Sequence, residues 1–283
     1  MWLLPGLIGT LVFAVFPFLN TIALSFTNAP AIGGGGRIVG LANYREMLGD
    51  SEFWQATTNS LCYMAIATPL LIVLPLLLAL LVEKQAPFVG VFRTGYYVPV
   101  LTSVVVAGIA WQFLLQDRGL VNTVLGKLHL IDGPLPFLTD QWLLLLACIA
   151  VTVWKGAGWY MVLYLVALGN VDQGQLEAAR IDGAGAVRRV WYVILPAIRP
   201  VMLLVGTLAA IGSLRVFAEV YMLGGPTGGP GGVDRTLPFL IRDAGLDPVN
   251  GNAGYGAAIS VGLFLLTLVV ALLGRAFVKE ETS

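Results

Sequence analysis

Residues 176–200 read LEAARIDGAGAVRRVWYVILPAIRP and form a charged, amphipathic segment in a chain that is otherwise mostly apolar. Just before it, Asp172 and Gln175 have the spacing of a helix capping box, which predicts that a short helix begins there. Asp182 and Gly183 tolerate the left-handed backbone that ends a helix and redirects the chain. The spacing therefore predicts a short helix followed by a glycine corner.

A second helical pattern follows the corner. Its apolar residues recur at i, i+3, i+4 and i+7, at Val187, Val190, Trp191 and Ile194. Pro196 and Pro200 are expected to break this helix and to start the next apolar run, because proline lacks an amide proton and fits best in a first turn. Two short helices joined by a glycine corner, held between membrane spans, predict a docking surface for another protein.

The composition places the chain among membrane proteins. Of its 283 residues, 58% are apolar and 11% are charged, and the mean hydropathy is +0.85. A soluble domain of this length presents far more charged surface. The formal net charge is zero, which gives no reason to expect a nucleic acid as partner.

Six long apolar runs follow one another along the chain. Each has the roughly 20 residues that a helix needs to cross about 30 Å of hydrocarbon. The runs cover residues 2–25, 60–82, 98–115, 142–168, 201–223 and 257–277. The predicted fold is an all-α, polytopic membrane protein with about six transmembrane helices, which puts both ends of the chain on one side of the membrane.

Motifs for metal binding and ATP hydrolysis are missing from the sequence. Cys62 and Cys148 both fall in apolar runs and have no ligand-like neighbours, so we expect neither a disulfide nor a metal site. The chain contains no phosphate-cradling GxxxxGKS or GxxxxGKT motif and no HExxH motif. We therefore expect no cofactor on this chain, and any step powered by ATP must use an ATPase on another chain.

The charged segment resembles the EAA loop of the membrane-spanning permease subunits of bacterial ABC importers. The resemblance rests on Glu-Ala-Ala at 177–179, three further residues, Gly183, nine further residues and Val-x-Leu-Pro at 193–196. The positions that match the sugar-importer form of this loop are Asp182, Ala184 and Pro200.

The resemblance extends over nearly the whole chain. The stretches RTGYYVPVLTSVVVAGIAWQF, VWKGAGWYMVLYLVAL and RVFAEVYMLGGPTGGP are similar to segments of permeases in the maltose and glycerol-phosphate importer class. The last stretch points to the first of the two permease types in that class. It departs from the family at Ala218, where an aspartate is common.

The resemblance implies the type I ABC importer permease fold. Residues 1–283 are then a single transmembrane permease domain, and residues 171–200 are the cytosolic EAA coupling loop within it. The residues to which the resemblance assigns ATPase coupling are Glu177, Ala178, Ala179, Asp182, Gly183, Ala184, Leu195 and Pro196.

The resemblance also implies partners. They are a second, homologous permease that forms a heterodimer with this chain, two copies of an ATP-binding subunit that hold ATP and magnesium, and an extracytoplasmic solute-binding protein. The chain would lie in the lipid of the bacterial cytoplasmic (inner) membrane with both termini in the cytosol. It would conduct its cargo without being an enzyme itself.

Charged residues inside the spans are candidates for the substrate pathway, because a charge at the centre of a membrane helix costs roughly 3 kcal/mol or more. Lys155 lies near the middle of its span, and the stretch from Trp154 to Tyr160 offers aromatic rings that either stack on sugars or only pack. Arg215 and Glu219 are four residues apart. Their spacing predicts one shared helix face, where they either line the pathway or only neutralise each other.

The resemblance implies that the cargo is a carbohydrate or a sugar derivative. The alternative in transport is a permease of an amino-acid or peptide importer, whose loop shares Glu-Ala-Ala and the glycine but usually not Asp-Gly-Ala and the second proline. An intramembrane hydrolase that uses Ser213 is a much weaker alternative. A serine nucleophile needs a base within hydrogen-bond reach, and the one histidine, His129, falls in a loop.

Overall fold

The structure is a computed structural model that describes residues 3–32, 34–83, 89–247 and 251–279. Helices dominate these residues, and their extended backbone pairs only in two isolated bridges. The predicted all-α class is therefore confirmed. Both chain termini lie outside the described residues, so their cytosolic placement stays a prediction.

The chain divides into two compact units. The first consists of residues 1–61 and 214–269, and the second consists of residues 62–213 and 270–283. Their action as a single permease domain stays a prediction.

The first unit contains the N-terminal helices, the start of α4 and most of α14. Its elements are α1 (Leu4–Thr10), a π-helical turn (Leu11–Val15), α2 (Phe16–Leu24), α3 (Ala42–Gly49), the first part of α4 (Ser51–Val82), α12 (Ala218–Gly224), α13 (Leu237–Leu246) and most of α14 (Ala253–Lys279).

The core of the first unit joins α3, α4, α13 and α14. Its buried apolar residues are Met47, Phe53, Ala56, Leu237, Leu240, Tyr255 and Ile259. Helix α4 begins beside this core because the Oδ1 atom of Asp50 accepts a hydrogen bond of 2.8 Å from the backbone N–H of Glu52. A carboxylate in this position satisfies one of the amide protons that every helix start leaves unpaired.

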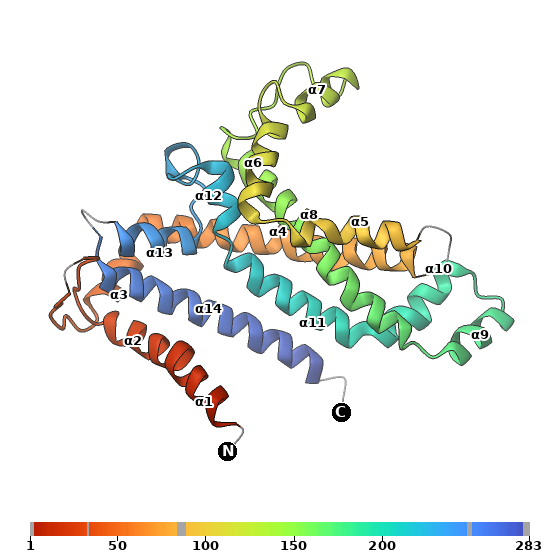
Figure 1. Cartoon of the computed structure of the whole chain (residues 1–283), viewed down its shortest axis with the longest axis horizontal. Helices are drawn as coiled ribbons and strands as arrows, with labels where there is room; N and C mark the ends of the chain where they lie inside the picture. The colour runs from red at the N-terminus through yellow and green to blue at the C-terminus, as the bar shows by residue number, and fades with distance from the viewer. Residues whose placement is uncertain (1–2, 33, 84–88, 248–250, 280–283) are drawn as a thin grey trace. The chain divides into compact units, whose positions relative to one another are not determined.

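The second unit contains the rest of α4 and the central helices of the chain. Its elements are α5 (Val89–Leu101), α6 (Val104–Leu115), α7 (Leu120–Lys127), α8 (Gln141–Gly169), α9 (Gln173–Ile181), α10 (Ala186–Arg189), a π-helical turn (Val190–Ile194) and α11 (Leu195–Leu214). Helices α5 and α8 lie side by side (Figure 1). A buried apolar cluster joins α4, α8, α9 and α11 through residues such as Leu76, Tyr164, Leu176 and Ile198.

Six helical runs in the described residues are long and apolar enough to cross a membrane, as predicted. They cover Leu4–Leu24, Ser51–Val82, Val104–Lys127, Gln141–Gly169, Ala186–Leu214 and Ala253–Ala276. The second run begins nine residues before the predicted position. Its first turns are too polar to be recognised as part of an apolar run, and packing on the core of the first unit stabilises them as helix.

The third span does not follow the prediction for residues 98–115. Helix α5 begins earlier, at Val89, and ends at Leu101, and α6 begins only at Val104. Between them Ser103 has an extended backbone with φ −55° and ψ 139°. The backbone N–H of Thr102 bonds to the carbonyl of Pro99 at 3.2 Å, which tightens the last turn and ends the helix.

The two prolines after the glycine corner, Pro196 and Pro200, do not break the helix, contrary to our prediction. Helix continues from Ala186 to Leu214 through Pro196 and Pro200. The π-helical turn Val190–Ile194 lies directly before Pro196, and within it the N–H of Leu195 bonds to the carbonyl of Val190. The wider turn accommodates the proline ring, so the second short helix and the fifth span form one continuous helix.

The fifth span ends before the predicted position. Helix α11 stops at Leu214, residues 215–217 are not helical, and α12 starts at Ala218. The predicted run 201–223 is thus two helices with a break between them.

Close packing of α5 on α8 depends on Gly158. A Cβ atom at this position would collide with the carbonyl of Tyr96 and would lie 2.9 Å from Cγ2 of Val100. The absence of a side chain therefore lets the two backbones approach, as is common between membrane helices.

We predict that Gly158→Ala lowers the stability of the protein by about 1–3 kcal/mol, because overpacking forces the two helices apart. Gly95→Ala is the matched control, since Gly95 lies on α5 with nothing within 4 Å of an added Cβ. The measurement is the thermal unfolding midpoint in detergent. Equal midpoints for the two variants would contradict the packing described here.

Candidate functional site

The segment 171–200, which we call the EAA segment, begins with the predicted helix cap. Asp172 is the N-cap of α9, and its Oδ1 atom accepts a hydrogen bond of 2.8 Å from the backbone N–H of Gly174. This bond fixes where the helix that carries Glu177 starts, next to the end of α8.

The predicted glycine corner is also confirmed. Gly183 has a φ of +76°, in the left-handed region. Its N–H bonds to the carbonyl of Arg180 at 3.0 Å, and the N–H of Ala184 bonds to the carbonyl of Ala179 at 2.9 Å. These two bonds form a Schellman motif, which satisfies the last carbonyls of α9 and sets the direction of the chain toward α10.

The EAA segment is anchored from one side and exposed on the other. Leu176 and Ile194 are buried in the cluster of the second unit. Among the residues assigned to coupling, Ala179, Ala184 and Leu195 are half-buried, and the exposed ones are Glu177, Ala178, Asp182, Gly183 and Pro196.

The predicted apolar face of the second short helix is divided. Val190 is half-buried and Ile194 is buried, but Val187 and Trp191 are 71% and 65% exposed. Ile181, before the corner, is 86% exposed. The described part of the EAA segment therefore presents a carboxylate, Glu177, together with large apolar side chains, a combination typical of a surface that another protein covers.

Lys155 binds the backbone at the break between α5 and α6, just before the third membrane-crossing run. Its Nζ atom donates a hydrogen bond of 2.8 Å to the carbonyl oxygen of Thr102, the residue that follows α5. A carbonyl at a helix end has no partner within the helix, and lipid offers none. The ammonium group on α8 therefore stabilises the break between α5 and α6.

The aromatic residues near Lys155 do not form one surface with it. Trp154 is 40% exposed and packs edge to face against Trp111, with ring centroids 5.9 Å apart. Tyr160 is half-buried. At about 100° per residue, Lys155 and Tyr160 point about 140° apart on α8, so the structure does not bring all three together.

Arg215 and Glu219 do not share a helix, so the predicted common face is wrong. Arg215 is exposed in the break after α11, and Glu219 is half-buried in the first turn of α12, where a carboxylate complements the helix dipole. The carbonyl of Val216, in the break, accepts a buried hydrogen bond of 2.7 Å from the hydroxyl of Thr236. No local sequence pattern indicates these roles of Thr236 and Thr102, because each acts through a partner that is distant in the sequence.

The described residues combine six helical runs long and apolar enough to cross a membrane with a capped helix-corner-helix segment, which is the architecture of a multi-span membrane protein. The chain belongs to the family of binding-protein-dependent transport system inner membrane components, whose pattern matches residues 36–281. It is therefore a transmembrane permease subunit and not an enzyme, which removes the hydrolase alternative.

Similar proteins cover almost the entire chain. The lactose transport system permease protein LacF of Rhizobium radiobacter is 30% identical over 99% of this chain and 94% of its own length. The arabinooligosaccharides transport system permease protein AraP of Bacillus subtilis is 32% identical over 95% of this chain and 84% of its own. A solved bacterial ABC transporter for the acidic polysaccharide alginate includes a chain with the same fold, with a TM-score of 0.84, 23% identity and coverage of 100% of this chain and 95% of that one.

We predict that Gly183→Ala loosens the corner, whereas Gly185→Ala does not. Neither glycine has an atom within 4 Å of an added Cβ, but only Gly183 has a positive φ. A side chain in the left-handed region costs roughly 1–2 kcal/mol. Hydrogen exchange at the amide of Ala184 should accelerate in the first variant alone, and equal rates in both variants would refute the Schellman motif.

We also predict that Lys155→Met lowers both thermal stability and transport rate. The substitution leaves the carbonyl of Thr102 without its donor, at a cost of about 1–3 kcal/mol. Lys155→Arg is the control, because it keeps a charged donor at the same site. Transport is measured in vesicles with expression matched, and a methionine variant that transports like the unsubstituted protein would reject this role for Lys155.

Proposed function

We propose that this chain is the permease subunit of an ABC importer that moves a carbohydrate or sugar derivative into the cytoplasm. Support comes from the relatives that span nearly the whole chain, which carry the names of lactose and arabinooligosaccharide permeases. The Asp-Gly-Ala corner and the second proline, Pro200, favour this cargo over an amino acid or peptide.

The EAA segment couples the permease to its ATPase. The exposed Glu177 and Ile181 lie on a helix whose other side is anchored by the buried Leu176. A helix held at its cap, its corner and its buried face moves as a rigid body, so a displacement imposed by a partner is passed on rather than absorbed. Because α10 continues into α11, the displacement reaches the fifth span directly.

The partners of the chain follow from the function. A second, homologous permease completes the pore, two ATP-binding subunits hold ATP and magnesium, and an extracytoplasmic solute-binding protein delivers the cargo. The first span supports a partner within the membrane, since none of the apolar stretch within Leu4–Leu24 is buried by the rest of the chain. Lipid and the second permease are the surfaces available to cover it.

The cargo passes along the interrupted spans. Membrane helices that break within the bilayer leave irregular backbone where it lines a cavity or is buried in protein. Transporters place their binding sites at such discontinuous helices. The breaks after α5 and after α11, with Lys155 and Thr236 at their carbonyls, are therefore where substrate contacts are sought.

The proposed orientation has the EAA segment in the cytosol and the glycine-rich loop around Thr227 outside, because one span separates them. In a background without Cys62 and Cys148, we predict that Thr227→Cys reacts with a membrane-impermeant maleimide in intact cells. Gln175→Cys, on α9, should react only after the cells are permeabilised. The opposite pattern would invert the topology and exclude an importer.

The cargo and the coupling are tested together in the reconstituted complex. The solute-binding protein that co-purifies with the chain is screened against sugars and amino acids, and we predict that only its sugar complex stimulates ATP hydrolysis. Glu177→Ala should reduce this stimulation about tenfold or more, because the loss of a charged interfacial contact costs 1.4 kcal/mol or more.

Gln175→Ala is the matched control for this assay, since Gln175 is exposed on another face of the same helix. Stimulation by an amino acid would overturn the cargo. Full sugar stimulation in the Glu177 variant would overturn the coupling role.

A further inference from the structure

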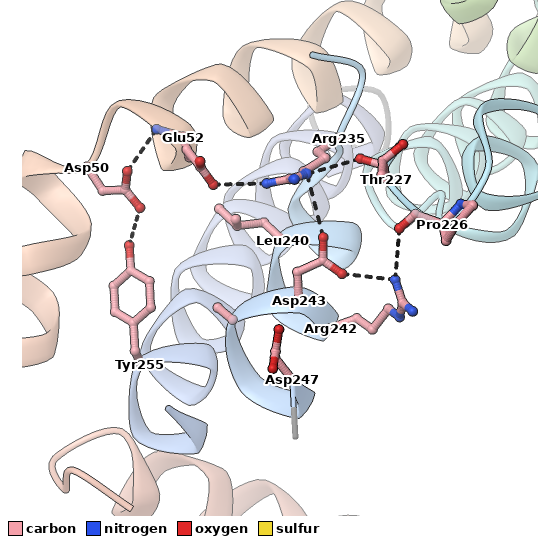
Figure 2. A pocket seen from close by; sticks show the side chains of 11 residues that line it. Asp50, Glu52, Pro226, Thr227, Arg235, Leu240, Arg242, Asp243, Asp247 and Tyr255 are labelled. Carbon is pink, nitrogen blue, oxygen red and sulfur yellow. Dashed lines mark hydrogen bonds and ion pairs between the residues drawn. The ribbon is translucent and has the colours of Figure 1, made fainter. Parts of the chain in front are cut away.

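A polar cavity of about 480 Å³ lies entirely within the first unit (Figure 2). Small-molecule sites usually measure roughly 300–1,000 Å³. Its wall is formed by the start of α4, the loop before α13, α13 itself and the start of α14. The polar side chains that could bind a ligand there are Asp50, Glu52, Arg235, Arg242, Asp243 and Tyr255.

Two arginines and their carboxylate partners form the polar wall. The Nη1 atom of Arg235 lies 3.0 Å from Oε2 of Glu52, and its Nε atom lies 3.5 Å from Oδ2 of Asp243. The Nη1 atom of Arg242 lies 2.9 Å from Oδ1 of the same Asp243. Burial raises the pKa of the Asp243 carboxyl above its ordinary value, while the two guanidinium charges oppose this shift.

The orientation of these groups is fixed by further contacts. The guanidinium carbon of Arg242 lies over the ring of Tyr221, 5.0 Å from its centroid. The hydroxyl of Tyr255 donates a hydrogen bond of 2.5 Å to Oδ2 of Asp50, whose other oxygen caps α4. The wall is therefore arranged before any ligand arrives, which reduces the entropy lost on binding.

The glycine-rich loop is tied to α4 through its backbone. The side-chain amide of Asn59 donates hydrogen bonds to the carbonyls of Val233 and Arg235, at 2.6 Å and 2.9 Å. The Nε atom of Arg235 also donates to the carbonyl of Thr227 at 3.1 Å. These bonds keep the arginine at the cavity although the neighbouring sequence is mostly glycine.

The remaining hydrogen-bonding capacity of the wall contains donors and acceptors side by side. A guanidinium group has five N–H donors, and an ionised carboxylate has about four lone-pair positions. The contacts of Arg235, Arg242 and Asp243 leave several of each for a ligand. Adjacent hydroxyls of a sugar ring each donate and accept, so they match such a wall better than a group that only accepts.

The charges on the wall exclude acidic ligands. The cavity is lined by four acidic side chains, Asp50, Glu52, Asp243 and Asp247, against two arginines. The formal excess is negative, and a carboxylate ligand would meet like charge as well as acceptors that it cannot pair with.

We propose that this cavity is a binding site for neutral carbohydrates, separate from the interrupted spans, which holds sugar on the outer side of the membrane before it enters the pathway. The assignment of sugar and of the outer side rests on the proposed function. The recognition of neutral over acidic sugars rests on the wall itself.

The test uses the assembled transporter in lipid nanodiscs without its solute-binding protein. Saturation-transfer NMR is recorded with lactose, trehalose and arabinotriose as neutral probes and with lactobionate as an acidic one. At least one neutral sugar should bind, and Asp243→Asn should weaken it about tenfold, since hydrogen bonds to charged groups are worth about 1.5–3 kcal/mol. Asp132→Asn, at an exposed aspartate of the second unit, is the control and should change nothing.

A second variant tests the charge of the wall without altering Asp243. Asp50→Asn combined with Glu52→Gln removes two charges without changing shape, and asparagine still caps α4. This variant should retain the neutral sugar and should gain binding of lactobionate. If lactobionate binds the unsubstituted transporter as well as lactose does, or the double variant gains nothing, the charge argument is overturned.

The outcomes separate this site from the proposed function. If the solute-binding protein delivers a sugar and stimulates ATP hydrolysis, but no neutral sugar gives a signal sensitive to Asp243→Asn, only the cavity assignment fails. If the solute-binding protein carries an amino acid, the proposed function fails whatever the NMR result. An equal loss in Asp132→Asn also overturns the site.

Discussion

The structure depends on one constraint, namely that each backbone N–H and C=O group inside lipid must have a hydrogen-bond partner within the protein. An unsatisfied group costs several kcal/mol there, so a span stays helical unless another residue forms hydrogen bonds with the backbone groups that the break leaves unpaired. Lys155 donates a hydrogen bond to the carbonyl of Thr102, and the hydroxyl of Thr236 donates one to the carbonyl of Val216. These contacts make the two interruptions stable features of the fold rather than frayed helix ends.

The same constraint explains how the EAA segment is connected. Pro196 removes an amide proton, and a helix that simply ended there would leave several carbonyls unpaired at the membrane surface. The π-helical turn before it keeps the helix intact from Ala186 to Leu214. The glycine corner at Gly183 is thus the last break in the helix before the fifth span, and one continuous helix joins the segment to that span.

Patterns confined to a short stretch of sequence predicted local structure well. Apolar runs gave the six spans, Asp172 gave the start of α9, and Gly183 gave the corner, because each of these features is decided by neighbours along the chain. The breaks were missed because their partners are remote: Lys155 lies 53 residues from Thr102, and Thr236 lies 20 residues from Val216. The shared face of Arg215 and Glu219 failed for the same reason. The cavity around Asp243 was not foreseen either, because it combines residues from 50 to 255.

The most direct test of the proposed pathway asks whether water and cargo reach the two breaks, at residues 102–103 and 215–217. Ser103→Cys and Phe217→Cys, made singly in a background without Cys62 and Cys148, are treated with a membrane-impermeant methanethiosulfonate reagent in the assembled transporter. Both should react, and the transported sugar should slow the reaction. A cysteine at Val106, a 59% exposed apolar position within α6, should stay unreactive. If neither interruption reacts, or if sugar protects neither, the breaks are structural and the pathway lies elsewhere.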